Sequence, residues 1–441
     1  MPSQLALIIC IIFVLVLLAT DHKQAPRVSY VLWIPTAWML LISGKPLGQW
    51  FGSGGDMETG SPLDRALCMA IICIGLIILT KKRFDWAKAI RGNSWLFLLF
   101  GYMLLSILWS DIPFISFKRW TREMVSVVVA LLILSEQNPR KALECVLRRS
   151  VYILIPFSFL LVNYFPDYGR DYNIWTGELM WTGVASQKNG LGRLCFISAL
   201  FLIWTLVRRW QKRDLSIMKY QIYFDVFLLI MTFYLLKGPG IGKGSASSVL
   251  ALCVGVTMLC VLLWMKKTKL FVKTNIFSVV IGVGFIFGTV TVFVAGSSVR
   301  MFTSIMGRDV TLTGRTDIWA ALLPAAMKQP ILGHGIGAFW TDSAQELYFK
   351  VNQSHNGYLD ILLDYGFIGL FFYLMFLLFS CRMARRELAY DYYWGSLWMS
   401  YLFMAVIHNI SEASIKTFLS QQTVLLLFLV FTSSISTGKK R

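Results

Sequence analysis

The sequence predicts an all-α integral membrane protein of about 12–13 transmembrane helices, with one large loop on the outer side. Of its 441 residues 56% are apolar and only 15% are charged, whereas soluble domains are about a quarter charged. The apolar residues form runs of roughly 15–24, the length that an α-helix needs to cross ~30 Å of hydrocarbon. An outer-membrane barrel would instead show alternating strands of about 10 residues, and the sequence has no such pattern.

The apolar runs predict thirteen spans. They lie near residues 3–20, 28–43, 63–80, 93–110, 123–135, 150–164, 190–207, 221–236, 246–265, 274–296, 358–380, 392–410 and 417–435. The first run has no basic segment before it and no small-residue cleavage site after it. We therefore expect a retained helix rather than a signal peptide.

Basic residues orient these spans. Of the 42 lysines and arginines, 26 fall in alternate connections and the C-terminal tail. The positive-inside rule places that side in the cytoplasm and the N-terminus outside. The net charge of +19 is thus explained by topology, and the expected partner is the lipid bilayer, with no nucleic acid.

We expect one polytopic domain over residues 1–441, with a single long insertion at residues 297–357 on the outer face. Within it, RTDIWAALLPAAMK has apolar residues at helical spacing, which predicts an amphipathic helix. PILGHGIGAFW follows as a glycine-rich turn that ends in aromatic residues suited to the membrane interface.

Several basic residues at outer helix ends run against the orienting rule, so each needs a reason. Arg119 and Arg122 in SFKRWTRE share one helical face, where they would contact either lipid headgroups or a membrane-borne phosphate. Lys188, Asn189 and Arg193 in SQKNGLGRLC form either a phosphate cradle or a solvated helix start. The spacing of a Walker A loop is absent.

Three further motifs lie on the outer side: Arg315 in TGRTDIW, His355 and Asn356 in SHNGYLD, and Glu412 in HNISEAS. Each also has a plainer interpretation. Arg315 would pair with Asp317, His355 would be a satisfied polar residue at a helix start, and Glu412 would be solvated or would orient a basic residue.

Together, GRTDIW, PILGHGIGAFW, SHNGYLDILLDYGFIG and HNISEAS resemble the O-antigen ligase/polymerase superfamily, and QKNGLG resembles the lysine–asparagine motif of its polymerase members. The resemblance is strongest over residues 183–414. It implies a GT-C-like glycosyltransferase of the bacterial inner membrane with its active site facing the periplasm. Such an enzyme moves a glycan from undecaprenyl pyrophosphate to an acceptor hydroxyl, without a cofactor or a metal.

The resemblance implies catalytic roles for two residues. The guanidinium of Arg315, with its fixed fork of donors, suits a bidentate pyrophosphate contact. His355 would act on the acceptor hydroxyl as base or orienting group. Pyrophosphate or glycan contacts would come from Lys188, Asn189, Arg193, Arg119, Arg122, Asn356 and Glu412.

No metal site is expected, because the outer side offers no carboxylate pair or His/Cys cluster with clear ligand spacing. The alternative is a weak Mg²⁺ site at Asp309 and Asp317, which flank Arg315.

One departure bears on the choice within the superfamily. Many ligases carry an arginine in a Ser-x-Ser-Arg-Thr stretch, where this chain reads KGSASSVLAL. With QKNGLG, this favours an exopolysaccharide or O-antigen repeat-unit polymerase over a lipid A-core ligase. The implied partners are the lipid-linked donor, a glycan or lipid A-core acceptor, a flippase and a chain-length regulator.

A polysaccharide flippase is a more distant alternative. It should place basic residues at the bundle midplane rather than in outer loops. Another alternative is a structural subunit of an export complex, which would have no catalytic activity.

Overall fold

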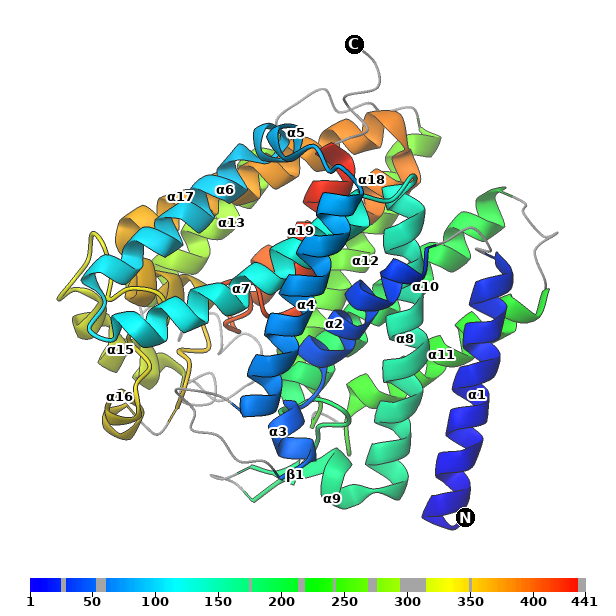
Figure 1. Cartoon of the computed structure of the whole chain (residues 1–441). Coiled ribbons are helices and arrows are strands. Elements are labelled where there is room, and N and C mark those ends of the chain that lie inside the picture. The colour runs from blue at the N-terminus through cyan, green and yellow to red at the C-terminus, as the bar shows by residue number, and fades with distance from the viewer. Residues whose placement is uncertain are drawn as a thin grey trace.

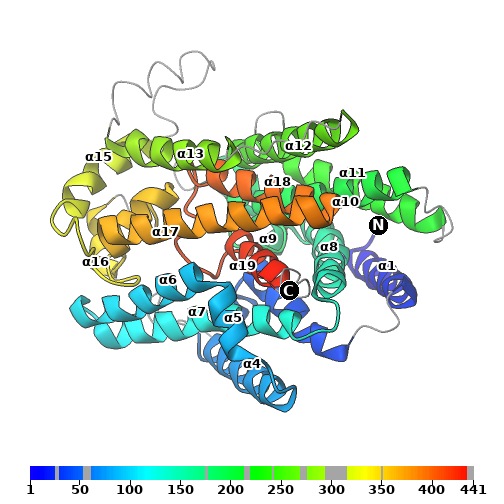
Figure 2. The same ribbon diagram turned by 90° about the horizontal axis from the view of Figure 1, so that it is seen from above.

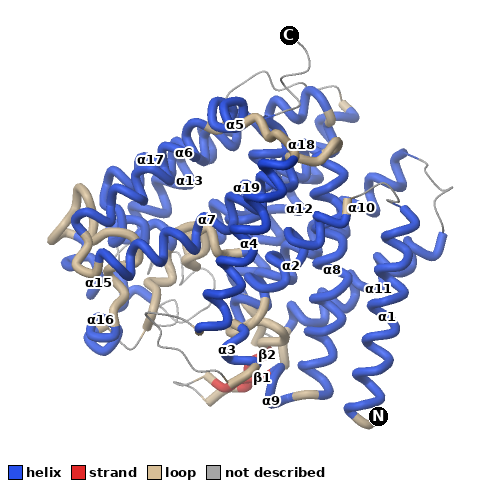
Figure 3. Tube along the Cα trace, in the orientation of Figure 1, coloured by secondary structure: helices blue, strands red, loops and turns tan. Residues whose placement is uncertain are grey.

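The computed structural model describes residues 1–24, 29–52, 61–173, 177–212, 219–240, 243–268, 276–293, 315–348 and 351–434. Helices account for most of this chain, and strand is confined there to one short hairpin beside α9 (Figure 3). The predicted all-α class is confirmed.

A helix overlaps each of the thirteen expected spans. These are α1 (Ser3–Gln24), α2 (Trp33–Ser43), α4 (Pro62–Lys81), α6 (Ser94–Leu105), α7 (Pro113–Leu134), α8 (Pro139–Tyr164), α10 (Lys188–Lys212), α11 (Lys219–Lys237), α12 (Ala246–Lys267), α13 (Ile276–Phe293), α17 (Gly357–Tyr390), α18 (Tyr392–His408) and α19 (Gln421–Ser434). Shorter elements connect them: η1 (Tyr30–Leu32), α3 (Leu47–Trp50), α5 (Trp86–Gly92), η2 (Ser106–Trp109), α9 (Pro166–Gly169), α15 (Arg315–Ala326) and α16 (Asp342–Leu347). Strands β1 (Arg170–Tyr172) and β2 (Leu179–Trp181) pair antiparallel.

Eight of the described helices are long and apolar enough to cross a membrane, and a ninth span results if the pair containing α5 and α6, bent by 94°, is counted as one. The chain is therefore a multi-pass membrane protein. The number is lower than thirteen for physical reasons. Helices α2 and α19, with 11 and 14 residues, are shorter than the ~20 residues that a span needs, and α7 carries several charges in its first half.

Helix ends differ from the predicted ones where polar residues extend a helix. Helix α7 begins at Pro113 rather than near residue 123, so Arg119 and Arg122 lie inside it. Helix α8 begins at Pro139, capped by Asn138, and α17 continues to Tyr390 through an expected connection.

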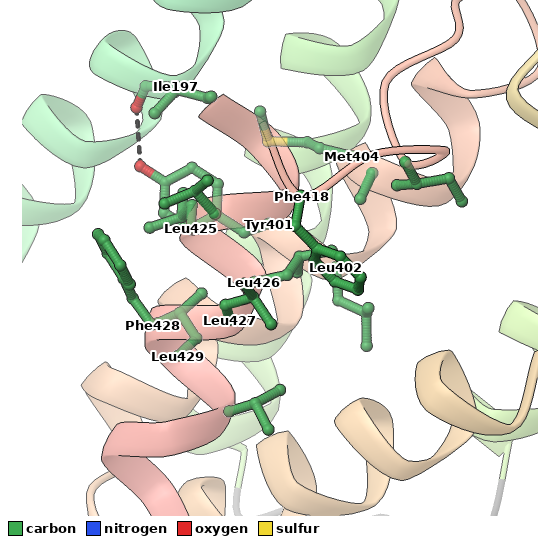
Figure 4. Close-up of a cluster of buried hydrophobic side chains, with 14 of the residues drawn as sticks. Ile197, Tyr401, Leu402, Met404, Phe418, Leu425, Leu426, Leu427, Phe428 and Leu429 are labelled. Carbon is green, nitrogen blue, oxygen red and sulfur yellow. Dashed lines mark hydrogen bonds between the residues drawn. The ribbon is translucent and has the colours of Figure 1, made fainter. Parts of the chain in front are cut away.

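Helix α19 lies at the centre of the bundle and packs against α7, α17 and α18. Seen from above, α11, α12 and α13 form a row on one side, and α6 and α7 lie on the other (Figure 2). Side chains of α19 from Leu425 to Leu429 are buried, and Tyr401 of α18 donates a hydrogen bond of 2.7 Å to the carbonyl of Ile197 (Figure 4). A helix that is apolar all round is expected in such a core.

The connections gather at two ends of the bundle. The N-terminus, α3, α9 and β1 lie toward one end, and α5 lies at the other (Figure 1). Connections predicted as cytoplasmic are joined by ion pairs such as Asp21–Arg149 at 2.9 Å and Arg140–Glu387 at 2.6 Å. This grouping agrees with the alternation of loops that the charge pattern predicts, and the cytoplasmic assignment stays a prediction.

The described parts of the long loop, residues 315–348 and 351–357, include the predicted helix. Helix α15 spans Arg315–Ala326 and packs against α13 and α17. Its Trp319 is buried and donates a 2.8 Å hydrogen bond to the carbonyl of Ser354. Asp309 lies outside the described residues.

The glycine-rich turn packs into a break in α17 at Gly366, where φ is 63°. The amides of His334 and Gly335 donate hydrogen bonds to the carbonyls of Leu363 and Asp364, at 2.9 and 2.8 Å. A Cβ atom on Gly366 would lie 2.3 Å from the carbonyl oxygen of Ile331. Glycine is therefore required there, by conformation as well as by space.

Candidate active site

One buried carboxylate holds three of the predicted site residues. Glu412, 1% exposed in the loop between α18 and α19, accepts hydrogen bonds through Oε1 from Arg315 Nη2 at 2.7 Å and from Asn189 Nδ2 at 2.6 Å. Its Oε2 lies 3.6 Å from Nδ1 of His355. We call Glu412, Arg315, His355 and Asn189 the Glu412 cluster.

Charge explains why this carboxylate is stable inside the protein. Burial opposes ionisation of Glu412, but contact with His355 and the positive charge of Arg315 outweigh it and lower the pKa of Glu412 to about 2. Glu412 is therefore ionised throughout the physiological range. It keeps Arg315, which is 17% exposed, tied to a fixed point.

Each member of the Glu412 cluster comes from a different segment with its own local constraint. Asn189 lies in the first turn of α10, and its Oδ1 accepts a 3.1 Å hydrogen bond from Ser245, the residue before α12. Arg315 is the first residue of α15. His355 has φ of 55°, a left-handed conformation that non-glycine residues rarely adopt. Unusual backbone of this kind is frequent at functional sites.

Asn356 has a different environment from its neighbour. It is fully buried, and its Oδ1 caps α17 by accepting hydrogen bonds from the amides of Tyr358 and Leu359, at 2.9 and 3.0 Å. Its Nδ2 donates to the carbonyls of Gly288 and Ile410. These contacts all go to the backbone and fix the start of α17 beside His355.

Two predicted cations lie near the Glu412 cluster. Arg193 lies on α10, and its positive charge interacts with Glu412 and with His408. Its Nε has no hydrogen-bond partner among the described residues. Lys188 begins α10 and lines a small pocket with Lys243 and Gly238. Lys243 was not among the predicted site residues. It lies in the stretch KGSASSVLAL, where many ligases carry an arginine.

Arg119 and Arg122 lie apart from the Glu412 cluster, in a neighbouring cavity of about 710 Å³. Arg119 donates a hydrogen bond to the carbonyl of Gly337. The lining includes Asp64, Arg119, Arg122, Glu123, Gln187, Trp340, Gln345, Asn352, Asp364, Tyr365 and Lys416. Lys416, paired with Asp360 at 3.2 Å, was not predicted, although it too is a basic residue on the outer side.

The cavity and the Glu412 cluster share their supporting segments. Gln187 precedes Asn189 by two residues, Asn352 precedes His355 by three, and Lys416 follows Glu412 by four. The cavity wall and the Glu412 cluster are therefore formed in part by the same three segments of the chain. Within the ranges that the structure describes, no group of three or more His, Cys, Asp or Glu side chains is arranged to hold a metal ion.

Comparison with known proteins finds a family match over part of the chain. The O-antigen ligase family matches residues 240–374, which contain Arg315, His355 and Asn356. This match supports a resemblance of that region to the O-antigen ligase/polymerase superfamily. It is also 22% identical over 299 residues to the exopolysaccharide production protein ExoQ of Rhizobium meliloti (strain 1021), covering 65% of this chain and 64% of that relative.

These two matches confirm the resemblance that the outer motifs indicated. The match to ExoQ spans less than two thirds of that protein's length. Asn189 and Glu412 lie outside the family match, so structure rather than similarity connects them to Arg315 and His355. Membrane location, transmembrane helices and a place in surface-polysaccharide assembly are supported together.

Proposed function

We propose that this protein is a periplasm-facing polymerase of exopolysaccharide or O-antigen repeat units in the bacterial inner membrane. It would transfer a glycan from undecaprenyl pyrophosphate to a hydroxyl of an acceptor glycan. The principal support is the meeting of Arg315 and His355, forty residues apart in sequence, on the single carboxylate of Glu412.

The donor half of the reaction needs positive charge where the leaving group forms. As the bond between the sugar anomeric carbon and the phosphate oxygen breaks, negative charge develops on that oxygen. Arg315 uses one nitrogen for Glu412, and its remaining N–H groups are available to a pyrophosphate oxygen. Such preorganised donors are often the largest single contribution to catalysis, and Arg193 and Lys188 would add charge nearby.

The acceptor half needs a base. With its Nδ1 facing an ionised carboxylate, His355 would carry its proton on that nitrogen and present Nε2 as the acceptor. The acceptor hydroxyl would form the new glycosidic bond, its proton would pass to His355 Nε2, and undecaprenyl pyrophosphate would leave. Glu412 would act as a positioning residue, orienting the base and the phosphate-binding arginine at once. No metal takes part in this proposal.

The polymerase is preferred to a lipid A-core ligase for two reasons. KGSASSVLAL lacks the arginine of many ligases, and Lys188 and Lys243 line one pocket at that place. The relative ExoQ is named for exopolysaccharide production. A flippase and a chain-length regulator would be the partners of such a polymerase.

Product analysis tests the choice. Purified protein in nanodiscs would be given the lipid-linked repeat unit alone. A polymerase should produce a ladder of longer lipid-linked glycans, because the donor also serves as acceptor. Formation of product only after lipid A-core is added would establish the ligase instead, and no product with either acceptor would refute both.

A further inference from the structure

We infer that the cavity lined by Arg122 and Asp364 binds sugar rings of the glycan, while the pyrophosphate stays outside it at the Glu412 cluster. This inference rests on the proposed function and assigns its two substrate groups to separate places. The ligand class is a hydroxyl-rich oligosaccharide rather than a phosphate.

Charge balance separates the two places. The cavity presents three basic side chains, Arg119, Arg122 and Lys416, and equally many acidic ones, Asp64, Glu123 and Asp364. Two of the three basic side chains are already engaged, because Arg119 donates to the carbonyl of Gly337 and Lys416 pairs with Asp360, so a diphosphate would find little free positive charge there. Around Glu412, by contrast, the two arginines Arg315 and Arg193 outnumber the single carboxylate. A pyrophosphate is therefore better placed at the Glu412 cluster.

Unpaired groups in the cavity call for a ligand that both donates and accepts hydrogen bonds. Asp364 is 3% exposed, and its Oδ1 has no hydrogen-bond partner among the described residues. A buried carboxylate oxygen without a donor is costly. Arg122 also lines the cavity, is exposed and has no ion pair within the described chain, so its guanidinium is available to donate to a ligand. A sugar hydroxyl can donate to Asp364 and accept from Arg122.

The rest of the lining fits carbohydrate as well. Trp340 and Tyr365 offer aromatic surface, and Gln187, Gln345 and Asn352 offer amides that donate and accept at once. The volume of about 710 Å³ lies within the ~300–1,000 Å³ of small-molecule sites. The cavity therefore suits a short oligosaccharide rather than a single anion.

Two variants and one matched control test this site. Arg122→Gln and Asp364→Asn remove a charge from the cavity without changing side-chain size greatly. Lys118→Gln removes a cation from the same helix, but Lys118 lies over the ring of Phe114 at 4.2 Å and does not line the cavity. Thermal unfolding of each purified variant shows whether it is folded.

Binding would be measured with two probes. One is undecaprenyl pyrophosphate without sugar, and the other is the lipid-free oligosaccharide released by mild acid from the host's own lipid-linked intermediate. Arg122→Gln and Asp364→Asn should weaken oligosaccharide binding at least about 10-fold, a loss of about 1.4 kcal/mol, and leave undecaprenyl pyrophosphate binding unchanged. Arg315→Lys should give the reverse pattern, and Lys118→Gln should match the wild type.

Two results would overturn the inference. One is weaker undecaprenyl pyrophosphate binding with normal oligosaccharide binding in a folded cavity variant, and the other is normal binding of both probes. Failure of the proposed function looks different. In that case Arg315→Lys would leave undecaprenyl pyrophosphate binding and polymer output normal, whatever the cavity variants do.

Discussion

Replacing Arg315 by lysine should impair turnover severely while leaving the protein folded. The guanidinium donates through Nη2 to Glu412 Oε1 at 2.7 Å, and its planar fork leaves further donors in a fixed direction. A lysine ammonium can still pair with Glu412, so the buried carboxylate keeps a cationic partner. We therefore expect the free energy of unfolding to change by no more than about 1 kcal/mol.

The loss of the fork should appear in catalysis. Removing one preorganised donor to a developing oxyanion costs about 10²–10³ in rate, and we expect kcat/KM to fall by that factor. The assay is polymer formation from purified lipid-linked donor, with thermal unfolding measured in parallel. Lys328→Gln, a charge change at an exposed position just after α15, is the control. Near-normal polymer from a stable Arg315→Lys variant would remove Arg315 from the mechanism.

Further predictions concern the neighbouring groups, the metal and the topology. His355→Ala should keep donor binding and slow the chemical step by about 10²–10⁴, as single-turnover kinetics would show, and a parallel loss of binding and stability would mean a structural role. Glu412→Gln should lower kcat more than it raises KM and cost about 2 kcal/mol of stability, with partial recovery of kcat in Glu412→Asp, whereas a purely structural role predicts no recovery. Polymer formation should be unaffected by EDTA, and activity that vanishes with EDTA and returns with Mg²⁺ would contradict this. A cysteine introduced at Lys328 should react with a membrane-impermeant thiol reagent in cells with a permeabilised outer membrane, and one within residues 208–220 should be protected, with the opposite result reversing the topology.

The sequence was informative where a single physical rule acts along the chain. Apolar run length predicted the helices, since the hydrocarbon core demands it. Helical spacing in RTDIWAALLPAAMK predicted α15. The resemblance of their motifs to the superfamily singled out Arg315 and His355, and in the structure both side chains lie beside Glu412.

The remaining features depend on contacts between distant segments. Nothing along the chain indicates that Glu412 joins Asn189 to Arg315, because those residues approach only after α10, α15 and the α18–α19 loop have packed. Helix ends were missed for a similar reason. Helix α8 begins before its apolar run and includes Arg149. The charge of Arg149 is neutralised by Asp21 of α1, whose Oδ2 lies 2.9 Å from Arg149 Nε. The cavity with Lys416 likewise has walls from many segments.

The break at Gly366 has a consequence for how the chain is inserted into the membrane. Its interrupted backbone groups are satisfied by residues 330–335, as in the 2.8 Å hydrogen bond from the amide of Phe367 to the carbonyl of Pro330. In lipid, unsatisfied backbone groups cost several kcal/mol each. Because the ribosome makes residues 330–335 before α17, the partner segment has already emerged when α17 needs it. Co-translational order thus protects the break, and a circular permutant that begins at Gly357 would have to insert α17 without this partner.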